Sequence, residues 1–296
     1  MQINDIDFSM SDLPFHITRP RSQSTAVIFA SPHSGRAYTN SFLQSSVLDQ
    51  LRLRSSEDAF VDVLFEDAPE FGAPLLCANT PRAYVDLNRA VDELDGALIH
   101  NVPKTRSNPR VASGLGVIPR VVANGRAIYH GKMQLITAEQ RLRDHWYPYH
   151  NALASLMGDT LHKFGQAMLI DCHSMPHEAL DSVAGNDNKR PDIVIGDRFG
   201  STCSGQITKH VAEGFRNAGF AVAHNVPFAG AYITQQYGRP SQGQHALQIE
   251  INRSLYMNEA HITPNANFHE FKAILNNVIS DIADIARDPR ALLAAE

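Results

Sequence analysis

The chain has 296 residues, of which 43% are hydrophobic and 19% charged, and its formal net charge is −5. This composition is typical of an ordinary globular protein, and the weak negative charge argues against nucleic acid as a partner. No apolar run approaches the roughly 20 residues that span a bilayer, so no membrane partner is expected. The chain has three scattered cysteines and no signal-peptide pattern at its start, which favours a cytoplasmic protein without disulfides.

Apolar runs alternate with helix-like stretches, which predicts an α/β fold with a mixed central β-sheet flanked by helices on both faces. We expect strands at residues 26–30, 75–78, 167–171, 193–196, 220–224 and 246–251. We expect helices at residues 57–71, 137–164, 204–218 and 268–287.

The helix expected at 137–164 has the clearest signals. Thr137 and Gln140 have the spacing of a capping box, in which each side chain satisfies a free backbone donor at the start of a helix. Apolar residues then recur every three or four positions. Gly165 follows where the helix should end.

No linker divides the chain, so we expect residues 1–296 to form a single domain. Residues 96–131 are its irregular part, with five glycines, three prolines and several basic residues. A stretch of this length without a clear element is usually functional or disordered. We interpret it as a flap or insertion over the site, and the alternative is a plain surface excursion.

Two histidines lie just past the ends of apolar runs that are expected to be strands. His33 comes after 26–30, and His173 comes after 168–170. The carboxyl ends of strands hold the site in open α/β sheets, so the two imidazoles could be metal ligands. A catalytic zinc keeps three protein ligands and one position for water. Glu57 and Asp58 are the best candidates for the third ligand, although acidic residues also favour helix N-termini for electrostatic reasons.

Cys172, beside His173, offers a different chemistry, that of a thiolate nucleophile with a histidine base. Adjacent residues on an extended chain point to opposite faces and are poorly placed to share a proton. We therefore expect Cys172 to be a small buried residue.

Glu250 lies at the end of an expected apolar strand, where a carboxylate is costly unless it is paired or has a chemical role. It could act as a general base with a raised pKa, or it could form a structural ion pair with Arg253. The segment 81–89 holds Arg82, Asn88 and Arg89, which would suit an acidic substrate. The alternative is a solvated loop in which Asp86 pairs with an arginine.

Four motifs in this order resemble the N-formylglutamate amidohydrolase family, and the match spans about residues 25 to 260. They are SPHSG at 31–35, RAYVDLNR at 82–89, DCHS at 171–174 and EINR at 250–253. The chain is more distantly similar to the zinc carboxypeptidase and aspartoacylase group. The resemblance implies a zinc-exopeptidase-like (phosphorylase/hydrolase-like) α/β fold, one catalytic zinc ion and hydrolysis of the formyl amide of N-formyl-L-glutamate. The products would be formate and L-glutamate, in histidine degradation.

The resemblance also implies a role for each motif residue. His33, Asp58 and His173 would hold the metal, with Asp58 fitting the family pattern better than Glu57 because Phe60, Val61 and Asp62 follow it. Glu250 would be the base. Asn88 and Arg89 would bind a substrate carboxylate, and Arg82 and Arg253 would bind either the second carboxylate or the developing oxyanion.

Two other functions remain open. One is a related metal-dependent amidohydrolase or carboxypeptidase-like enzyme that acts on another N-acyl amino acid or a peptide. Its specificity could lie in the basic residues of 96–131, which are Lys104, Arg106, Arg110, Arg120 and Arg126. The other is a non-catalytic binding module on the same fold, against which the four intact motifs argue. The expected partner is a small acidic N-acyl amino acid, and divalent ions other than zinc would also suit these ligands.

Overall fold

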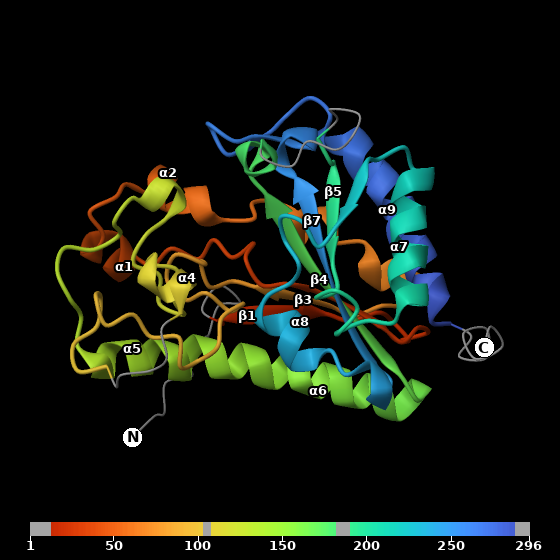
Figure 1. The fold of residues 1–296 in the computed structure, drawn as a ribbon, viewed down its shortest axis with the longest axis horizontal. Helices are drawn as coiled ribbons and strands as arrows, with labels where there is room; N and C mark the ends of the chain where they lie inside the picture. Colours follow the sequence, from red (N-terminus) through yellow and green to blue (C-terminus); the bar gives the residue numbers. More distant parts are fainter. Residues whose placement is uncertain (1–12, 103–107, 182–189, 288–296) are drawn as a thin grey trace, which may run out of the picture.

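The computed structural model describes residues 13–102, 108–181 and 190–287. A seven-stranded mixed sheet forms its centre, with the strand order β1-β3-β2-β4-β7-β5-β6 (Figure 1). Its strands are β1 Phe15–Thr18, β2 Val27–Ser31, β3 Leu75–Ala78, β4 Ala167–Met175, β5 Ile193–Gly196, β6 Val222–His224 and β7 Gln244–Asn252. A separate pair consists of β8 Met257–Asn258 and β9 Thr263–Pro264. The predicted α/β class with a mixed sheet is confirmed.

Helices cover both faces of the sheet (Figure 1). Those in the described ranges are α1 Asn40–Ser45, α2 Gln50–Leu53, α3 Val61–Leu64, α4 Pro109–Ala112, α5 Leu135–Arg141, α6 Tyr147–Phe164, α7 Gly205–Asn217, α8 Tyr232–Tyr237 and α9 Phe268–Ile285. Successive strand residues point to opposite faces. Val27 and Phe29 of β2 therefore join the core under α7 and α9, whereas Ile28 and Ala30 join the core under α6.

The register of the central strands determines where the site lies. β2, β4 and β7 are neighbours and run parallel, so their carboxyl ends meet at one edge of the sheet. His173 of β4 lies directly opposite Glu250 of β7, and His33 follows the last residue of β2. Three residues that are distant in sequence thus share one edge.

The predicted strands agree with the structure better than the predicted helices do. The strands expected at 75–78 and 193–196 have those bounds. β4 and β7 extend beyond the expected 167–171 and 246–251, so that His173 and Glu250 lie within strands. β6 is shorter than expected, and β1 was not predicted.

The helix expected at 57–71 is wrong in part, because only α3 and a 3-10 turn at Ala68–Phe71 form there. Phe60 has a φ of 67°, in the left-handed region, which no helix interior adopts. A bulky residue held there costs about 1–3 kcal/mol. Its ring packs edge-on against Phe268 of α9, with centroids 5.9 Å apart, so tertiary packing replaces the expected helix.

The capping box at Thr137 is also wrong. The helix begins earlier, at Leu135, and Gln134 precedes it without a side-chain cap bond. A π-helical turn at Leu142–Trp146 then separates α5 from α6. The end is as predicted, since Gly165 follows α6 with a φ of 74°.

The irregular segment 96–131 contains α4 and a 3-10 turn at Ala123–Gly125. Lys104 and Arg106 lie outside the described residues. In the described ranges, no helix has both the length and the apolar character needed to cross a membrane.

His150 of α6 gives the fold a specific pH dependence. Its ring is buried, its Nε2 donates to the Leu87 carbonyl oxygen at 2.9 Å, and its Nδ1 lies 3.0 Å from the Tyr237 hydroxyl. Burial lowers the pKa of this imidazole from 6.5 to about 4. Between these two values the unfolded chain binds more protons at this position than the native protein does. The free energy of unfolding therefore falls as pH decreases from 6.5 to 4.

We predict that His150 contributes about 3 kcal/mol to this fall. Denaturant unfolding of the wild type and of His150→Gln between pH 4 and pH 7.5 measures this contribution. All other groups titrate in both proteins, so their effect cancels in the difference between the two unfolding free energies. The difference in unfolding free energy between the two should shrink as pH decreases. A difference that is constant with pH would contradict the assignment.

Candidate metal centre and active-site cavity

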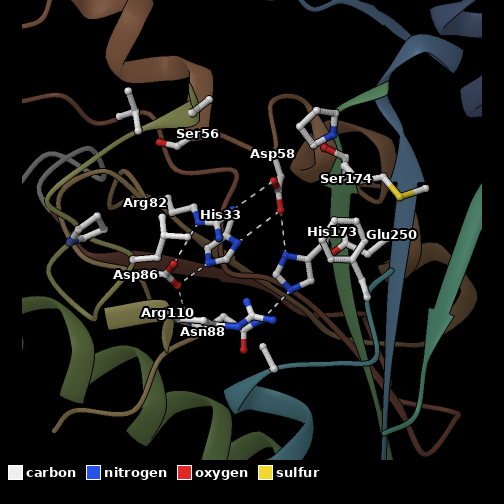
Figure 2. Close-up of a pocket in the computed structure, with 18 of the residues that line it drawn as sticks. His33, Ser56, Asp58, Arg82, Asp86, Asn88, Arg110, His173, Ser174 and Glu250 are labelled. Atoms are coloured by element: carbon white, nitrogen blue, oxygen red, sulfur yellow. Dashed lines mark hydrogen bonds and ion pairs between the residues drawn. The ribbon is translucent and has the colours of Figure 1, made fainter. Parts of the chain in front are cut away.

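A cavity of about 470 Å³ opens at the carboxyl edge of the sheet. Its polar lining combines residues from strands with residues from the loops and short helical turns beside them, namely His33, Ser55, Ser56, Asp58, Arg82, Asp86, Asn88, Arg89, Arg110, Ser113, Asn124, His173, Ser174, Gln248, Glu250 and Arg253. All eight predicted site residues are among them. Figure 2 shows the central members.

His33, Asp58 and His173 form the centre of this cavity. One nitrogen or oxygen atom from each lies within 4.8 Å of the other two, and all three residues are buried. Asp58 Oδ2 lies 2.8 Å from His173 Nδ1 and 3.4 Å from His33 Nδ1, so the two rings are turned toward one carboxylate (Figure 2). The Asp58 amide also donates to the His33 carbonyl oxygen at 3.0 Å, which ties the two segments together.

A second carboxylate lies behind each histidine. His33 Nε2 donates to Asp86 Oδ1 at 2.8 Å, and His173 Nε2 lies 3.0 Å from Asp171 Oδ2. Metal-binding histidines almost always donate their other ring nitrogen to such a partner, which fixes the orientation of the ring. Both Nδ1 atoms therefore face the same point in space.

The charges in this cluster shift the pKa values of its members. Burial would lower the pKa of His173, but Asp171 and Asp58 raise it well above 6.5. Burial would raise the pKa of Asp86, but His33 and Arg82 hold it well below its usual range. The acidic groups thus favour positive charge between them, in the form of a proton or a metal ion.

A divalent metal fits these residues. His33 Nδ1 is buried and has no hydrogen-bond partner within the described part of the chain, which is costly unless another group binds it. Two imidazole nitrogens and one carboxylate oxygen are a common three-ligand set for catalytic zinc. Glu57 is not part of this set, because both of its carboxylate oxygens accept hydrogen bonds from Arg54.

Glu250 lies beside the centre, buried in β7. Gln248 donates to its Oε1 at 2.9 Å. Burial, with a smaller effect from Asp58, raises the pKa of this carboxyl group to about 7 against the opposing influence of His173. A group with this pKa can accept and release a proton near neutral pH. In the described ranges Glu250 forms no ion pair with Arg253, which rules out the structural alternative.

The predicted substrate-binding side chains differ in how completely protein groups bind them; they are Arg82, Asn88, Arg89 and Arg253. Arg253 donates to Asp58 Oδ1 at 2.9 Å and to the Ser174 hydroxyl at 3.2 Å. Asn88 donates to Asp171 at 3.4 Å and accepts from the Ile233 amide at 2.8 Å.

Arg82 and Arg89 are held less completely. Arg82 donates to Asp86 at 3.1 Å, and its side chain is 28% exposed. Arg89 is nearly buried, yet its nearest carboxylate oxygens, on Asp86 and Glu93, are 3.9 and 4.0 Å away. Its Nε has no hydrogen-bond partner in the described part of the chain. Each of these two arginines therefore has N–H donors that form no hydrogen bond within the described part of the chain.

Cys172, Asp86 and Asp171 also lie in or near the site. Cys172 is fully buried, and burial raises the pKa of its thiol well above 9, which agrees with its expected structural role. Asp86 and Asp171 were missed as partners of the histidines. Asp171 could have been found, because residues two apart on a strand share a face and Asp171 precedes His173 by two. Asp86 lies on an irregular loop and gives no such signal.

The segment 96–131 contributes Arg110 and several residues between Ser113 and Gly125 to the cavity wall. Arg120 is not among them, since it pairs with Asp95 at 2.8 Å. Whether the segment moves as a flap stays a prediction.

Fold and site together define an α/β protein with a candidate metal centre at the carboxyl edge of a mixed sheet. The chain belongs to the N-formylglutamate amidohydrolase family, whose model matches residues 25–257. The family resemblance of the four motifs is thereby confirmed, and with it the assignment to a family of amidohydrolases.

Two curated relatives are N-formylglutamate deformylases. The one from Pseudomonas aeruginosa is 29% identical over 237 residues, covering 79% of this chain and 82% of the relative. The one from Pseudomonas putida is 26% identical over 241 residues, with the same coverage.

Two solved structures share the fold. The crystal structure of N-formylglutamate amidohydrolase from Ralstonia eutropha JMP134 superposes with a TM-score of 0.86 at 33% identity, covering 93% of this chain and 98% of that one. A gene product from Agrobacterium tumefaciens superposes with a TM-score of 0.66 at 15% identity, covering 97% of this chain and 96% of that one. The finer likeness to zinc exopeptidases stays a prediction.

We predict that purified protein binds one divalent ion per chain and that Asp58→Asn loses it, because the substitution weakens one of three ligands. Glu57→Gln is the matched control, since it changes the adjacent buried carboxylate and should retain the ion. Asp171→Asn should weaken metal affinity about 10- to 100-fold, as removal of a histidine's outer partner does. Elemental analysis and competition with a chelator measure all three. Equal loss of metal from the two neighbouring variants would contradict the ligand set.

Proposed function

We propose that the protein hydrolyses the formyl amide of N-formyl-L-glutamate, releasing formate and L-glutamate, with one metal ion held by His33, Asp58 and His173. The observation that carries the proposal is a buried glutamate with a pKa near 7 beside a His–Asp–His set, in a cavity lined by arginines. Membership of the amidohydrolase family and the two curated deformylases support it. Zinc is the ion that we propose, because two histidines and a carboxylate are typical of its catalytic sites.

A divalent ion bound there supplies a Lewis acid that polarises a carbonyl group and makes water more acidic. Glu250 accepts the proton of the water that attacks the formyl carbon. It then donates this proton to the amide nitrogen as the C–N bond breaks, so that glutamate leaves as an amine and formate remains. Burial is what prepares Glu250 for both steps, because an exposed glutamate has too low a pKa to return the proton at neutral pH.

We assign different roles to the arginines of the cavity, namely stabilising the oxyanion and binding a substrate carboxylate. Arg82 is partly exposed toward the cavity, and we assign it to the oxyanion that develops during attack, where one good donor contributes about 3–4 kcal/mol. Arg89 is nearly buried with weakly paired nitrogens, and we assign it to a substrate carboxylate, which it can bind through two parallel hydrogen bonds. Asn88 and Arg253 are already bonded to Asp171 and Asp58. Their contacts favour a supporting role over direct substrate binding.

We predict that formate release from N-formylglutamate stops on chelation and returns on addition of zinc. Glu250→Gln should lower kcat by about 10²- to 10⁴-fold, the usual effect of a positioned acid–base group, while the bound metal is retained. Glu57→Gln is the matched control and should keep its activity, because Glu57 does not line the cavity. Near-normal turnover by Glu250→Gln would remove this residue from the role.

We predict that Arg89→Ala lowers the preference for N-formylglutamate over neutral N-formyl amino acids, chiefly by raising KM. The expected change is about 10- to 100-fold, because a hydrogen bond to a charged group contributes about 1.5–3 kcal/mol. Arg120→Ala is the control, since its guanidinium is held by Asp95 outside the cavity. An unchanged preference would contradict the assignment of Arg89.

The same substrate series separates the competing functions. A relative that acts on another N-acyl amino acid would share the metal centre and Glu250, and would differ only in which acyl group or side chain it prefers. A non-catalytic binding module would bind metal and turn over none of these amides.

A further inference from the structure

The site depends on a loop without regular secondary structure. Residues 79–90 include Arg82, Asp86, Asn88 and Arg89, and none of these residues belongs to a helix or a strand. Few backbone hydrogen bonds form within the loop, such as Tyr84 N to Pro81 O, and others tie it to neighbouring segments, such as Thr80 N to Pro14 O and Asp86 N to Val117 O. Side chains from other segments add further contacts that hold its shape.

Four of these side chains come from one helical stretch, residues 141–150. Side-chain hydrogen bonds connect it to the loop at four points: His145 Nδ1 lies 2.7 Å from the Thr80 hydroxyl, Arg141 Nη1 donates to the Tyr84 carbonyl oxygen at 3.4 Å, His150 Nε2 donates to the Leu87 carbonyl oxygen at 2.9 Å, and Trp146 Nε1 donates to the Arg89 carbonyl oxygen at 2.9 Å. The contacts occur every two to four residues from one end of the loop to the other.

An ordinary α-helix could not present all four side chains to the same loop. At 3.6 residues per turn, Trp146 would lie about 140° around the axis from Arg141. The chain instead forms a π-helical turn at Leu142–Trp146, in which the Tyr147 amide donates to the Leu142 carbonyl oxygen five residues back. This π-helical turn contains about one residue more than an α-helical turn. Trp146, five residues after Arg141, therefore lies closer to the side of the helix that carries Arg141.

The sequence contains a physical cause for this turn. Pro148 is the second residue of α6 and has no amide hydrogen, so it cannot donate to the carbonyl oxygen of Asp144 as an α-helix requires. Because this α-helical hydrogen bond cannot form, π-helical hydrogen bonding costs less free energy here than it would in an uninterrupted α-helix.

Arg141 makes the contact costly to break. Its guanidinium is nearly buried and has no carboxylate partner within the described ranges. It lies 4.0 Å from the centroid of the Tyr84 ring and donates to the Tyr129 hydroxyl at 2.7 Å. A buried cation that depends on aromatic rings would lose this stabilisation if the loop moved.

We propose that the π-helical turn Leu142–Trp146 sets the position of the loop 79–90, so that Trp146 is a positioning residue for Arg89. Trp146 is not among the described residues that line the cavity, and it acts through the carbonyl group of Arg89. The kinetic consequence rests on the proposed function, but the structural consequence does not.

Trp146→Phe tests this, because it keeps an aromatic ring and removes the N–H donor, although the smaller ring also leaves a cavity beside His150 and Tyr232. Thr160→Val is the matched control. Thr160 is buried on the same α6 helix and accepts a hydrogen bond from Gln23 at 2.9 Å, away from the loop. Each variant removes one hydrogen bond from the same helical stretch, and Trp146→Phe should lose more thermal stability than Thr160→Val because it also leaves a cavity.

Hydrogen exchange of the loop amides is the first measurement and needs no substrate. We expect exchange at Tyr84, Asp86 and Asn88 to become about tenfold faster in Trp146→Phe, the effect of losing one hydrogen bond, and to stay unchanged in Thr160→Val. Unchanged exchange in Trp146→Phe would overturn the proposal, whatever the enzyme hydrolyses.

Steady-state kinetics with N-formylglutamate is the second measurement. We expect Trp146→Phe to raise KM about tenfold with little change in kcat, and to have no further effect in an Arg89→Ala background, because the two residues then act as one unit. A full additional effect in that background, or faster exchange without any change in KM, would refute the positioning role. A wild type that releases no formate would refute the proposed function instead, and the exchange result would still decide this inference.

Discussion

Asp58 is the group on which the site depends, because this buried carboxylate lies next to both histidines of the predicted ligand set. Its Oδ2 lies between the two imidazole Nδ1 atoms, and its Oδ1 accepts from Arg253 at 2.9 Å. An unpaired charge buried in this way would cost several kcal/mol. Asp58 can therefore be ionised only while the surrounding cations and imidazoles stay in place, and they in turn need Asp58.

The remaining charges around the cavity follow from the same constraint. Asp86 and Asp171 face the outer nitrogens of the two histidines, and Arg82 donates to Asp86 in turn. Each carboxylate thus has a positive or hydrogen-donating neighbour, and each ring has one nitrogen fixed and one directed inward. Glu250 is the exception, since Gln248 is the one side chain in the described ranges that donates to it and burial keeps its pKa high. The group that is least neutralised is the one suited to moving a proton.

Some site residues lie on strands of the central sheet and others on a loop, and the two groups are held in place differently. His173 and Glu250 lie opposite each other in the ladder between β4 and β7, so backbone hydrogen bonds fix their separation. Arg82, Asp86 and Arg89 lie on a loop, which allows the cavity wall to be shaped independently of the sheet. The helical stretch with the π-helical turn gives this loop the support that a strand receives from its neighbours.

The sequence alone determined the elements whose signals are local. Apolar runs located the central strands, and chemistry-bearing residues at their carboxyl ends identified His33, His173 and Glu250 before any contact was known. The tertiary structure was needed to show that Asp58 lies beside both histidines while Glu57 is bonded to Arg54. It also showed Asp86 and Asp171 as the outer partners of the two rings, and Asn88 and Arg253 bonded to protein groups. The same holds for the left-handed Phe60 and for the π-helical turn, which replaced an expected continuous helix at each place. Hydrophobic periodicity is a property of neighbouring residues, whereas these outcomes depend on which distant groups share a buried space, where every charge and donor needs a partner.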